Sequence, residues 1–373
     1  MGLVGLFRVF LAMIVAADHA QIFIFGGSVL PFAGYGSAPV CAFFIMSGFY
    51  MAMVLDTKYM KMPAPDGVRA FYLNRALRIY PSYWLILCVS ALLMLRDHQT
   101  SILFWTQSTE AAWNALAGFP SAIVALIASS NILIFGIDYL IVRRIMPDGN
   151  IVTSAEFGAI PAHSFMLFPP AWTLAVEMLF YLLAPIIMLR RTILIVASCV
   201  ATALILGLGV PQAGSPLNLS YCIAGMATYY LYTALPDTPV VRRAGGLMTA
   251  ATMLFAVAAN HIPIDNSIRV NIFIAMTWLM MPFAFMASRD LRFDRWLGNA
   301  SYGMYVSHFA LYKFLSMVVS DQIRTTVYFP ALLTAGLLLA RFVERPLEKH
   351  AKNIFPNRAS IGKPVSLDHG RIL

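Results

Sequence analysis

The chain has 373 residues, of which 60% are hydrophobic and only 12% are charged. Its mean hydropathy of +0.74 excludes ordinary soluble proteins, because a soluble fold of this size could not bury so much apolar surface. The composition therefore predicts an all-α polytopic membrane protein. We attribute the net charge of +9 to cytoplasmic loops facing anionic lipid headgroups, so no nucleic-acid partner is expected.

Apolar runs long enough for membrane spans recur along the whole chain. They lie near 6–25, 38–55, 79–95, 120–142, 171–189, 192–210, 219–235, 244–260, 270–288, 301–320 and 325–343. If every run crossed, basic pairs such as Arg190 and Arg191 would face outside. If 97–170 is instead an external loop, with 120–142 as a re-entrant or interfacial segment, most of the 26 Lys and Arg face the cytoplasm. This pattern predicts about ten transmembrane helices with both termini cytoplasmic.

The same arrangement divides the chain into one domain and a tail. Residues 1–353 are expected to form a single transmembrane domain, and 354–373 a disordered cytoplasmic tail. Arg143 and Arg144 remain outside, against the general charge pattern. The four cysteines lie in apolar runs without a CxxC pair, which indicates buried thiols and neither a disulfide framework nor a metal site.

Arg8 and His19 are the most informative pair of residues, and both lie in the first apolar run. Eleven residues make about three helical turns plus 20°, so the two side chains share one face, ~16 Å apart along the axis. Charged and titratable groups inside a span are costly and usually face a polar cavity. The alternative is an Arg that reaches the cytoplasmic edge and a His satisfied by a neighbouring helix.

Two further motifs lie within the second run and at the cytoplasmic start of the third. Ser47 precedes a glycine among aromatic residues, which permits close approach by a ligand or by a crossing helix. Arg75 and Arg78 are three residues apart and share a helix face. Their guanidinium groups could hold phosphates as a fork, or they could simply anchor the helix at lipid headgroups.

Glu177 lies in the span that begins at the outer surface. Thr173, Glu177 and Tyr181 share one face, and Glu177 lies ~10 Å below that surface. Because His19 also lies toward the outer half, Glu177 could pair with it and orient the imidazole ring. Asp18 is a second candidate partner, or a substrate contact. An interhelical hydrogen bond is the structural alternative for Glu177.

Polar residues recur near the end of the chain. Ser301, Tyr305 and His308 fall on one face, and His308 is expected in the inner half, nearer the arginines. The sequence thus predicts one histidine toward each side of the membrane. Glu344 closes the last span ahead of a proline, and we expect it to pair with cytoplasmic arginines.

These motifs, taken in order, resemble acyltransferase family 3. The matching elements are the Arg8–His19 spacing, FFIMSGF, RALRIYP, WTLAVEMLFYLLAP, LGNASYGMYVSH and ERP, and together they extend over most of the chain. Members of this family are integral-membrane O-acyltransferases that modify bacterial surface and exported glycans. The resemblance implies a bacterial inner-membrane O-acetyltransferase with acetyl-CoA, or another acyl-CoA, as cytoplasmic donor substrate and no bound cofactor. It implies a saccharide or lipid-linked glycan acceptor, such as exopolysaccharide or O-antigen, at the outer side.

The resemblance also suggests roles for individual residues. Arg8 and His19 match the family's essential pair, Arg75 and Arg78 its arginine motif, and Glu177 its buried acid.

In the mechanism that we expect, His19 is the general base, and Glu177 or Asp18 fixes its tautomer. Arg75 and Arg78 hold the phosphates of the donor, with Arg8 behind the thioester.

Ser47, Tyr305 and His308 are expected to complete the donor site. The competing hypothesis is a proton-coupled transporter or exporter of a small polar solute. In that case Arg8, Glu177 and His308 would form a proton relay.

Overall fold

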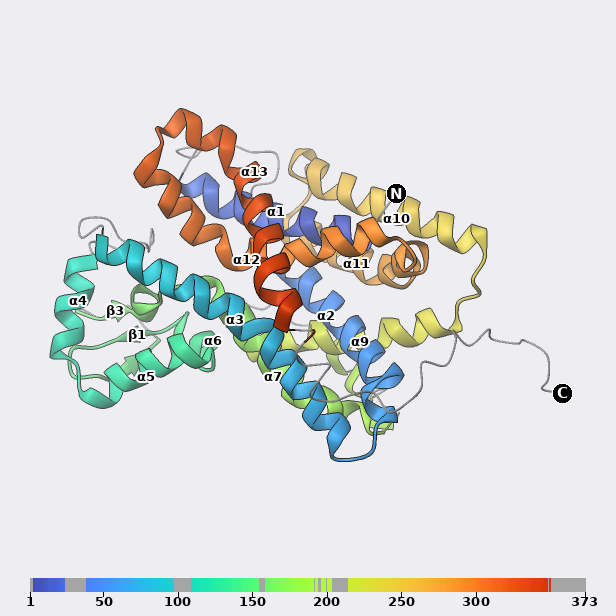
Figure 1. The fold of residues 1–373 in the computed structure, drawn as a ribbon, viewed down its shortest axis with the longest axis horizontal. Helices are drawn as coiled ribbons and strands as arrows, with labels where there is room; N and C mark the ends of the chain where they lie inside the picture. The colour runs from blue at the N-terminus through green and yellow to red at the C-terminus, as the bar shows by residue number, and fades with distance from the viewer. Residues whose placement is uncertain are drawn as a thin grey trace.

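The computed structural model describes residues 3–23, 38–96, 109–153, 158–190, 192–193, 196–198, 200–202, 214–347 and 349. Figure 1 shows a bundle of long helices with a smaller unit packed beside one end of α3. The long helices are α1 (Val4–Phe23), α2 (Ala38–Thr57), α3 (Asp66–Arg96), α7 (Trp172–Met188), α9 (Leu219–Ala234), α10 (Pro239–Ala258), α11 (Asn266–Ser288), α12 (Arg292–Val318) and α13 (Asp321–Leu339).

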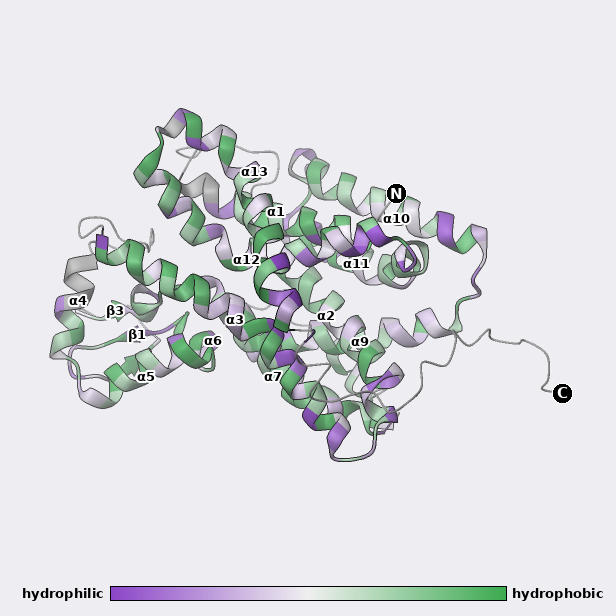
Figure 2. Ribbon diagram, viewed as in Figure 1, coloured by the Kyte–Doolittle hydropathy of each residue, from purple (hydrophilic) through white to green (hydrophobic). Residues whose placement is uncertain are grey.

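The all-α membrane class is confirmed. In the part of the chain that the structure describes, six helical segments are long and apolar enough to cross a membrane. Hydrophobic residues run along the helices in Figure 2. Several of them are exposed on the surface of the bundle, among them Leu92, Leu95, Leu247 and Leu254. Outward-facing leucines on long helices match a lipid environment.

α2 forms the centre of the bundle, whereas α3 and α10 lie at its periphery. Of the most apolar stretch of each helix, 72% is buried in α2, 28% in α3 and 22% in α10. α2 crosses α9 closely, since a Cβ atom on Gly48 would lie 1.9 Å from the carbonyl oxygen of Cys222. The glycine of the Ser47–Gly48 pair therefore serves a helix crossing, as small residues often do in membranes.

The described part of the predicted external loop, residues 109–153 and 158–170, forms a unit of short helices and strands, here called the cap. It contains α4 (Thr109–Gly118), α5 (Ser121–Leu133), α6 (Ile137–Leu140) and a small antiparallel sheet, ordered β2–β1–β3, of β1 (Arg144–Ile145), β2 (Ile151–Val152) and β3 (Ile160–Pro161). Helix α5 has 13 residues, hence ~20 Å, and ends at Ile134, whose φ is 72°. Since a bilayer core is ~30 Å thick, 120–142 is not one straight span.

Aromatic side chains of α3 attach the cap to the bundle. The side chains of Tyr83, Trp84 and Tyr80 donate hydrogen bonds of 2.5, 2.9 and 2.8 Å to the carbonyls of the last three residues of α5. Those carbonyls have no partner within their own helix, so α3 satisfies the C-terminal end of α5.

The two arginines that contradicted the charge pattern have structural partners in the cap. Arg144 lies in β1 and donates to the carbonyl of Ala159 at 3.2 Å. The guanidinium of Arg143 lies 4.8 Å from the ring centre of Tyr139. These contacts explain how basic residues are retained in a segment that is expected to be external.

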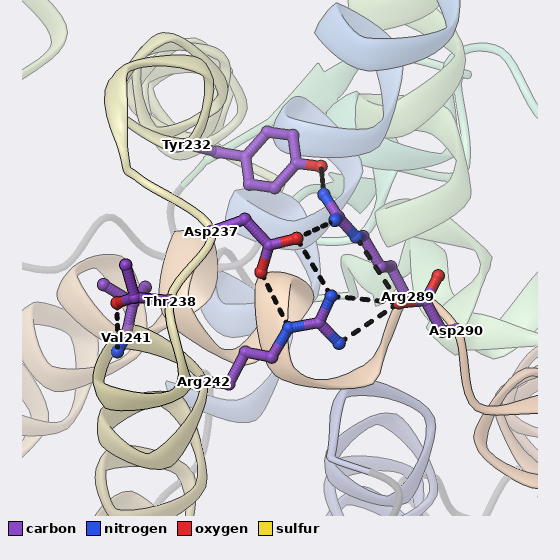
Figure 3. A network of polar contacts seen from close by, with 7 residues as sticks. All are labelled: Tyr232, Asp237, Thr238, Val241, Arg242, Arg289 and Asp290. Atoms are coloured by element: carbon purple, nitrogen blue, oxygen red, sulfur yellow. Dashed lines mark hydrogen bonds and ion pairs between the residues drawn. The ribbon is translucent and has the colours of Figure 1, made fainter. Parts of the chain in front are cut away.

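Two of the predicted basic loops meet at one end of the bundle, in the cluster of Figure 3. Asp237, between α9 and α10, accepts hydrogen bonds from Arg242 at 2.7 Å and from Arg289 after α11. Arg242 also bonds Asp290 at 3.1 Å. The hydrogen bond from Arg242 lowers the pKa of the Asp237 carboxyl group. Because these groups are partly exposed, the cluster contributes little stability, and its main effect is to hold the two loops together.

The cysteine prediction is only partly correct. Cys41 and Cys222 are buried, but Cys88 is exposed, because it lies on the outer face of the peripheral helix α3. Cys199 and the tail 354–373 fall outside the described residues.

Candidate active site

One cavity of about 400 Å³ lies among α1, α2, α3, α7 and α12. Six of the predicted site residues line it: Arg8, Ser47, Arg75, Arg78, Glu177 and Tyr305. Thr173, Tyr181 and Ser301, which the same motifs contain, also line it. The volume falls within the usual range for small-molecule sites. Residues from five helices, nearly 300 positions apart in sequence, therefore meet at one site.

Basic groups outnumber acidic groups in the lining of the cavity. Arg8, Arg75 and Arg78 are joined there by Arg295, and the acidic residues Glu177 and Asp294 face the same space. A cavity with this balance favours an anionic ligand, and the planar guanidinium group suits phosphate or carboxylate. Sequence reasoning missed Arg295 and Asp294, which lie in a polar segment ahead of the LGNASY motif.

Arg75 is held by weak contacts rather than by a carboxylate. Its guanidinium carbon lies 6.0 Å from the ring centres of both Phe71 and Tyr181, and Nη1 lies 3.9 Å from the sulfur of Met51. Its Nε atom is buried and has no hydrogen-bond partner among the described residues. A buried donor of this kind calls for an explanation, and a bound anion would satisfy it.

Arg8 lies near both aromatic and acidic groups. Its guanidinium carbon is 5.9 Å from the ring centre of Tyr50. Tyr50, Glu177 and Glu344 interact with it electrostatically with favourable sign, and Arg78 with unfavourable sign. Burial is the largest unfavourable contribution to this cation, and the two carboxylates offset only part of it.

Glu177 is oriented by hydroxyl groups from two helices. The Ser47 hydroxyl donates to Glu177 Oε1 at 2.7 Å, and the Tyr181 hydroxyl donates to the same oxygen. Thr173, Glu177 and Tyr181 all line the cavity, so their predicted common face is confirmed. The expected pairing of Glu177 with His19 is wrong, because this carboxylate faces the arginine-lined cavity and His19 lies elsewhere.

His19 packs against His308 and is not among the described residues that line the cavity. The two ring centres are 5.0 Å apart, and Phe309 lies 4.9 Å from His19. His19 Nδ1 donates to the carbonyl of Val15 at 2.8 Å. The backbone thus fixes the tautomer, a role expected of Glu177 or Asp18, and leaves Nε2 of the neutral ring as the basic nitrogen. Asp18 is half-buried and interacts with His19 electrostatically.

His308 is fully enclosed. It is 1% exposed, its Nδ1 donates to the carbonyl of Tyr305, and its Nε2 has no hydrogen-bond partner among the described residues. The prediction of one histidine toward each side of the membrane is wrong. Helix α12 begins at Arg292, nine residues before the predicted run, so His308 lies deeper along it and reaches His19. His308 was expected to complete the donor site, but it is not among the described residues that line the arginine-lined cavity.

Tyr305 and Thr173 separate the cavity from the histidine pair. The two hydroxyl groups are 2.7 Å apart, and the Tyr305 hydroxyl donates to the Pro170 carbonyl at 2.9 Å. Both residues line the cavity, and the Tyr305 ring centre lies 5.7 Å from that of His308. Tyr305 therefore touches both regions.

Glu344 lies beside the site in a single π-helical turn, Ala340–Glu344, that follows α13. It is 3% exposed, and the Ser82 hydroxyl donates to its Oε1 at 3.4 Å. Glu344 interacts electrostatically with Arg8, and its expected ion pair with cytoplasmic arginines stays a prediction. π-turns of this kind occur frequently at functional sites.

Comparison with known proteins identifies a family but no individual relative. A family model described as an acyltransferase domain matches residues 4–344, nearly the whole chain. No curated protein matches the chain, and no solved structure does. The match includes every residue of the cavity and of the histidine pair named above.

Proposed function

The chain belongs to acyltransferase family 3 and is a membrane acyltransferase; from this premise we propose that it is an O-acetyltransferase of exported glycans. The proposed donor is acetyl-CoA, or another acyl-CoA, bound from the cytoplasm. The proposed acceptor is a saccharide hydroxyl, on exopolysaccharide, O-antigen or a lipid-linked glycan, at the outer side of the bacterial inner membrane. The predicted transporter has no comparable support, because His308 does not join Arg8 and Glu177 in the lining of the cavity.

The observation that carries the proposal is the set of arginines in one cavity. Arg75, Arg78, Arg8 and Arg295 line it, and the buried Nε of Arg75 has no partner among the described residues. Acetyl-CoA has its phosphates at one end of a long arm and the acetyl thioester at the other end. The arginines of the lining suit those phosphates, and the apolar side chains that share the lining, such as Phe43 and Phe44, suit the arm.

The proposed topology has ten spans and both termini in the cytoplasm. The first residues of α1 contact the start of α12, and the loops after α9 and α11 meet in the cluster of Figure 3. Their basic residues support a cytoplasmic position for this end. His19 lies 15 residues into α1, ~22 Å further along, which supports an acceptor site toward the opposite side.

The chemistry needs a base for the attacking hydroxyl group. In our proposal His19 Nε2 accepts the hydroxyl proton while the oxygen attacks the thioester carbonyl carbon. A C–O bond forms, the C–S bond breaks, and the proton ends on the thiolate sulfur of coenzyme A. Asp18 stabilises the imidazolium through its charge, and His308 packs against the His19 ring. Glu177 with Ser47 and Tyr181 shapes the donor side.

The test is transfer of labelled acetyl groups. Membranes containing the protein are incubated with acetyl-CoA radiolabelled in the acetyl group, beside a His19→Ala variant checked for expression and folding. We expect base-labile label in the glycan or lipid-linked fraction with the unmodified protein only. Label that is equal in both samples would exclude His19 as the base. No label with folded protein and native acceptor would contradict acetyl-CoA as the donor.

A further inference from the structure

Asp294 joins the N-terminal ends of α1 and α12. Its carboxylate accepts hydrogen bonds from the backbone N–H of Gly5 at 2.9 Å and of Leu6 at 3.0 Å. Both N–H groups belong to the first turn of α1, where they have no partner within the helix. Asp294 is 4% exposed and acts as an N-cap that comes from another helix.

The two helices run parallel in one register. Gly5 and Asp294 are 289 residues apart in sequence, and His19 and His308 have the same separation. Because the contacting pairs Gly5–Asp294 and His19–His308 have the same sequence separation, α1 and α12 remain side by side over the 14 residues between them, ~21 Å. Between these ends one row of each helix packs against the other: Val9, Ala12 and Ala16 of α1, with Leu297, Ala300 and Met304 of α12.

The capped ends of the helices approach unusually closely. A Cβ atom on Gly5 would lie 1.8 Å from the carbonyl oxygen of Asp294, and one on Gly298 would lie 3.0 Å from the Cα of Gly5. Glycines at both positions therefore permit contact between the backbones. The contact brings the N–H groups within reach of a short side chain such as aspartate.

Asp294 also lines the arginine-rich cavity, beside Gly5 and Arg8. A carboxylate there opposes the binding of an anionic donor, so binding of that donor does not account for it. The positive end of the α1 dipole and two N–H bonds offset its charge.

We propose that Asp294 is a positioning residue that sets the register of α1 against α12. In that register Arg8 faces the donor cavity while His19 meets His308. A slip of one turn would move both side chains by ~5.4 Å relative to α12 and separate the base from its partner. The roles of Arg8 and His19 rest on the proposed function; the register itself does not.

Two substitutions separate positioning from charge. Asp294→Asn keeps one of the two oxygens that accept from Gly5 and Leu6 and removes the charge, whereas Asp294→Glu keeps the charge and lengthens the side chain. We expect Asp294→Asn to retain kcat within about threefold, since Asn is as good an N-cap as Asp, and Asp294→Glu to lose kcat about tenfold. The reverse order, or a lower donor KM as the main effect of Asp294→Asn, would overturn the proposal.

Cross-linking reads the register without any catalytic activity. In a chain whose native cysteines are replaced, Ala12→Cys and Ala300→Cys are oxidised, and the rate of disulfide formation is measured. We expect the rate to be unchanged with Asp294→Asn and to fall about tenfold with Asp294→Glu. Asp290→Ala, which removes an exposed acid of the same segment, is the matched control and should leave the rate unchanged. Equal rates in all variants would refute the register role, even if the protein transferred no acetyl group.

Discussion

The arginine-lined cavity and the histidine pair share α1 and α12 but differ in their surroundings. Charged groups and hydroxyls line the cavity together with apolar side chains such as Phe43 and Phe44, and Glu177 bonds Ser47 and Tyr181 there. Aromatic rings enclose the histidines, with Phe309 4.8 Å and Phe168 5.9 Å from His308. The cavity is thus suited to holding charge and the pair to moving a proton in an apolar setting. The comparison suggests that binding and chemistry are divided between two places.

The largest expected effect tests the chemical half of this division. His19→Gln should lower kcat by ~10²–10⁴-fold, the usual contribution of a general base, while the donor KM stays within about twofold. Steady-state kinetics with purified protein in nanodiscs measures both parameters. A donor KM that rises as much as kcat falls would show that His19 also contributes to donor binding, and the two regions would then form one functional site.

The arginine pair tests the binding half. Replacing Arg75 and Arg78 together by Gln should raise the donor KM by ~10–100-fold, because charge-assisted bonds to phosphate are lost, with a smaller change in kcat. Lys58→Gln, which removes a cation on the loop after α2 and outside the cavity lining, serves as control. An unchanged donor KM would mean that the pair only anchors the helix.

Tyr305→Phe tests the boundary between the two regions. The change removes the hydroxyl that bonds Thr173 and Pro170 but keeps the ring beside His308. We expect ~1 kcal/mol of lost stability and a loss of activity of about fivefold, shared between kcat and KM. Thermal unfolding and kinetics would show this. A change confined to one kinetic parameter would assign Tyr305 to one region alone.

The smallest effect concerns the cap and leaves both regions untouched. Burial, with Arg144 nearby, lowers the pKa of His163 in the folded cap. The unfolded cap then binds more protons, so its stability should fall as the pH drops below about 6.5. Amide hydrogen exchange in β1–β3 at pH 5 and 7 measures this. Burial raises the pKa of Asp138, so protonation of this carboxyl group stabilises the folded cap at lower pH, opposite to His163. Subtracting the pH dependence of the His163→Gln variant from that of the unmodified protein gives the contribution of the imidazole alone.

The sequence by itself determined the class, most of the helices and the family. Apolar length fixes where helices can lie in a bilayer, and the one-face rule correctly grouped Thr173, Glu177 and Tyr181. The sequence also identified six of the site residues that line one cavity, because polar groups inside membrane spans are costly and therefore gather where they meet one another.

Only the tertiary structure decided which polar groups meet. Glu177 and His19 were matched by estimated depth, but depth does not specify which faces of two helices are in contact. The depth of His308 was misjudged because α12 extends through a charged segment whose hydropathy conceals the helix. Asp294 lay in that segment without a local signal, since it caps a helix 289 residues away. Contacts between distant helices depend on packing and register, which local periodicity does not encode.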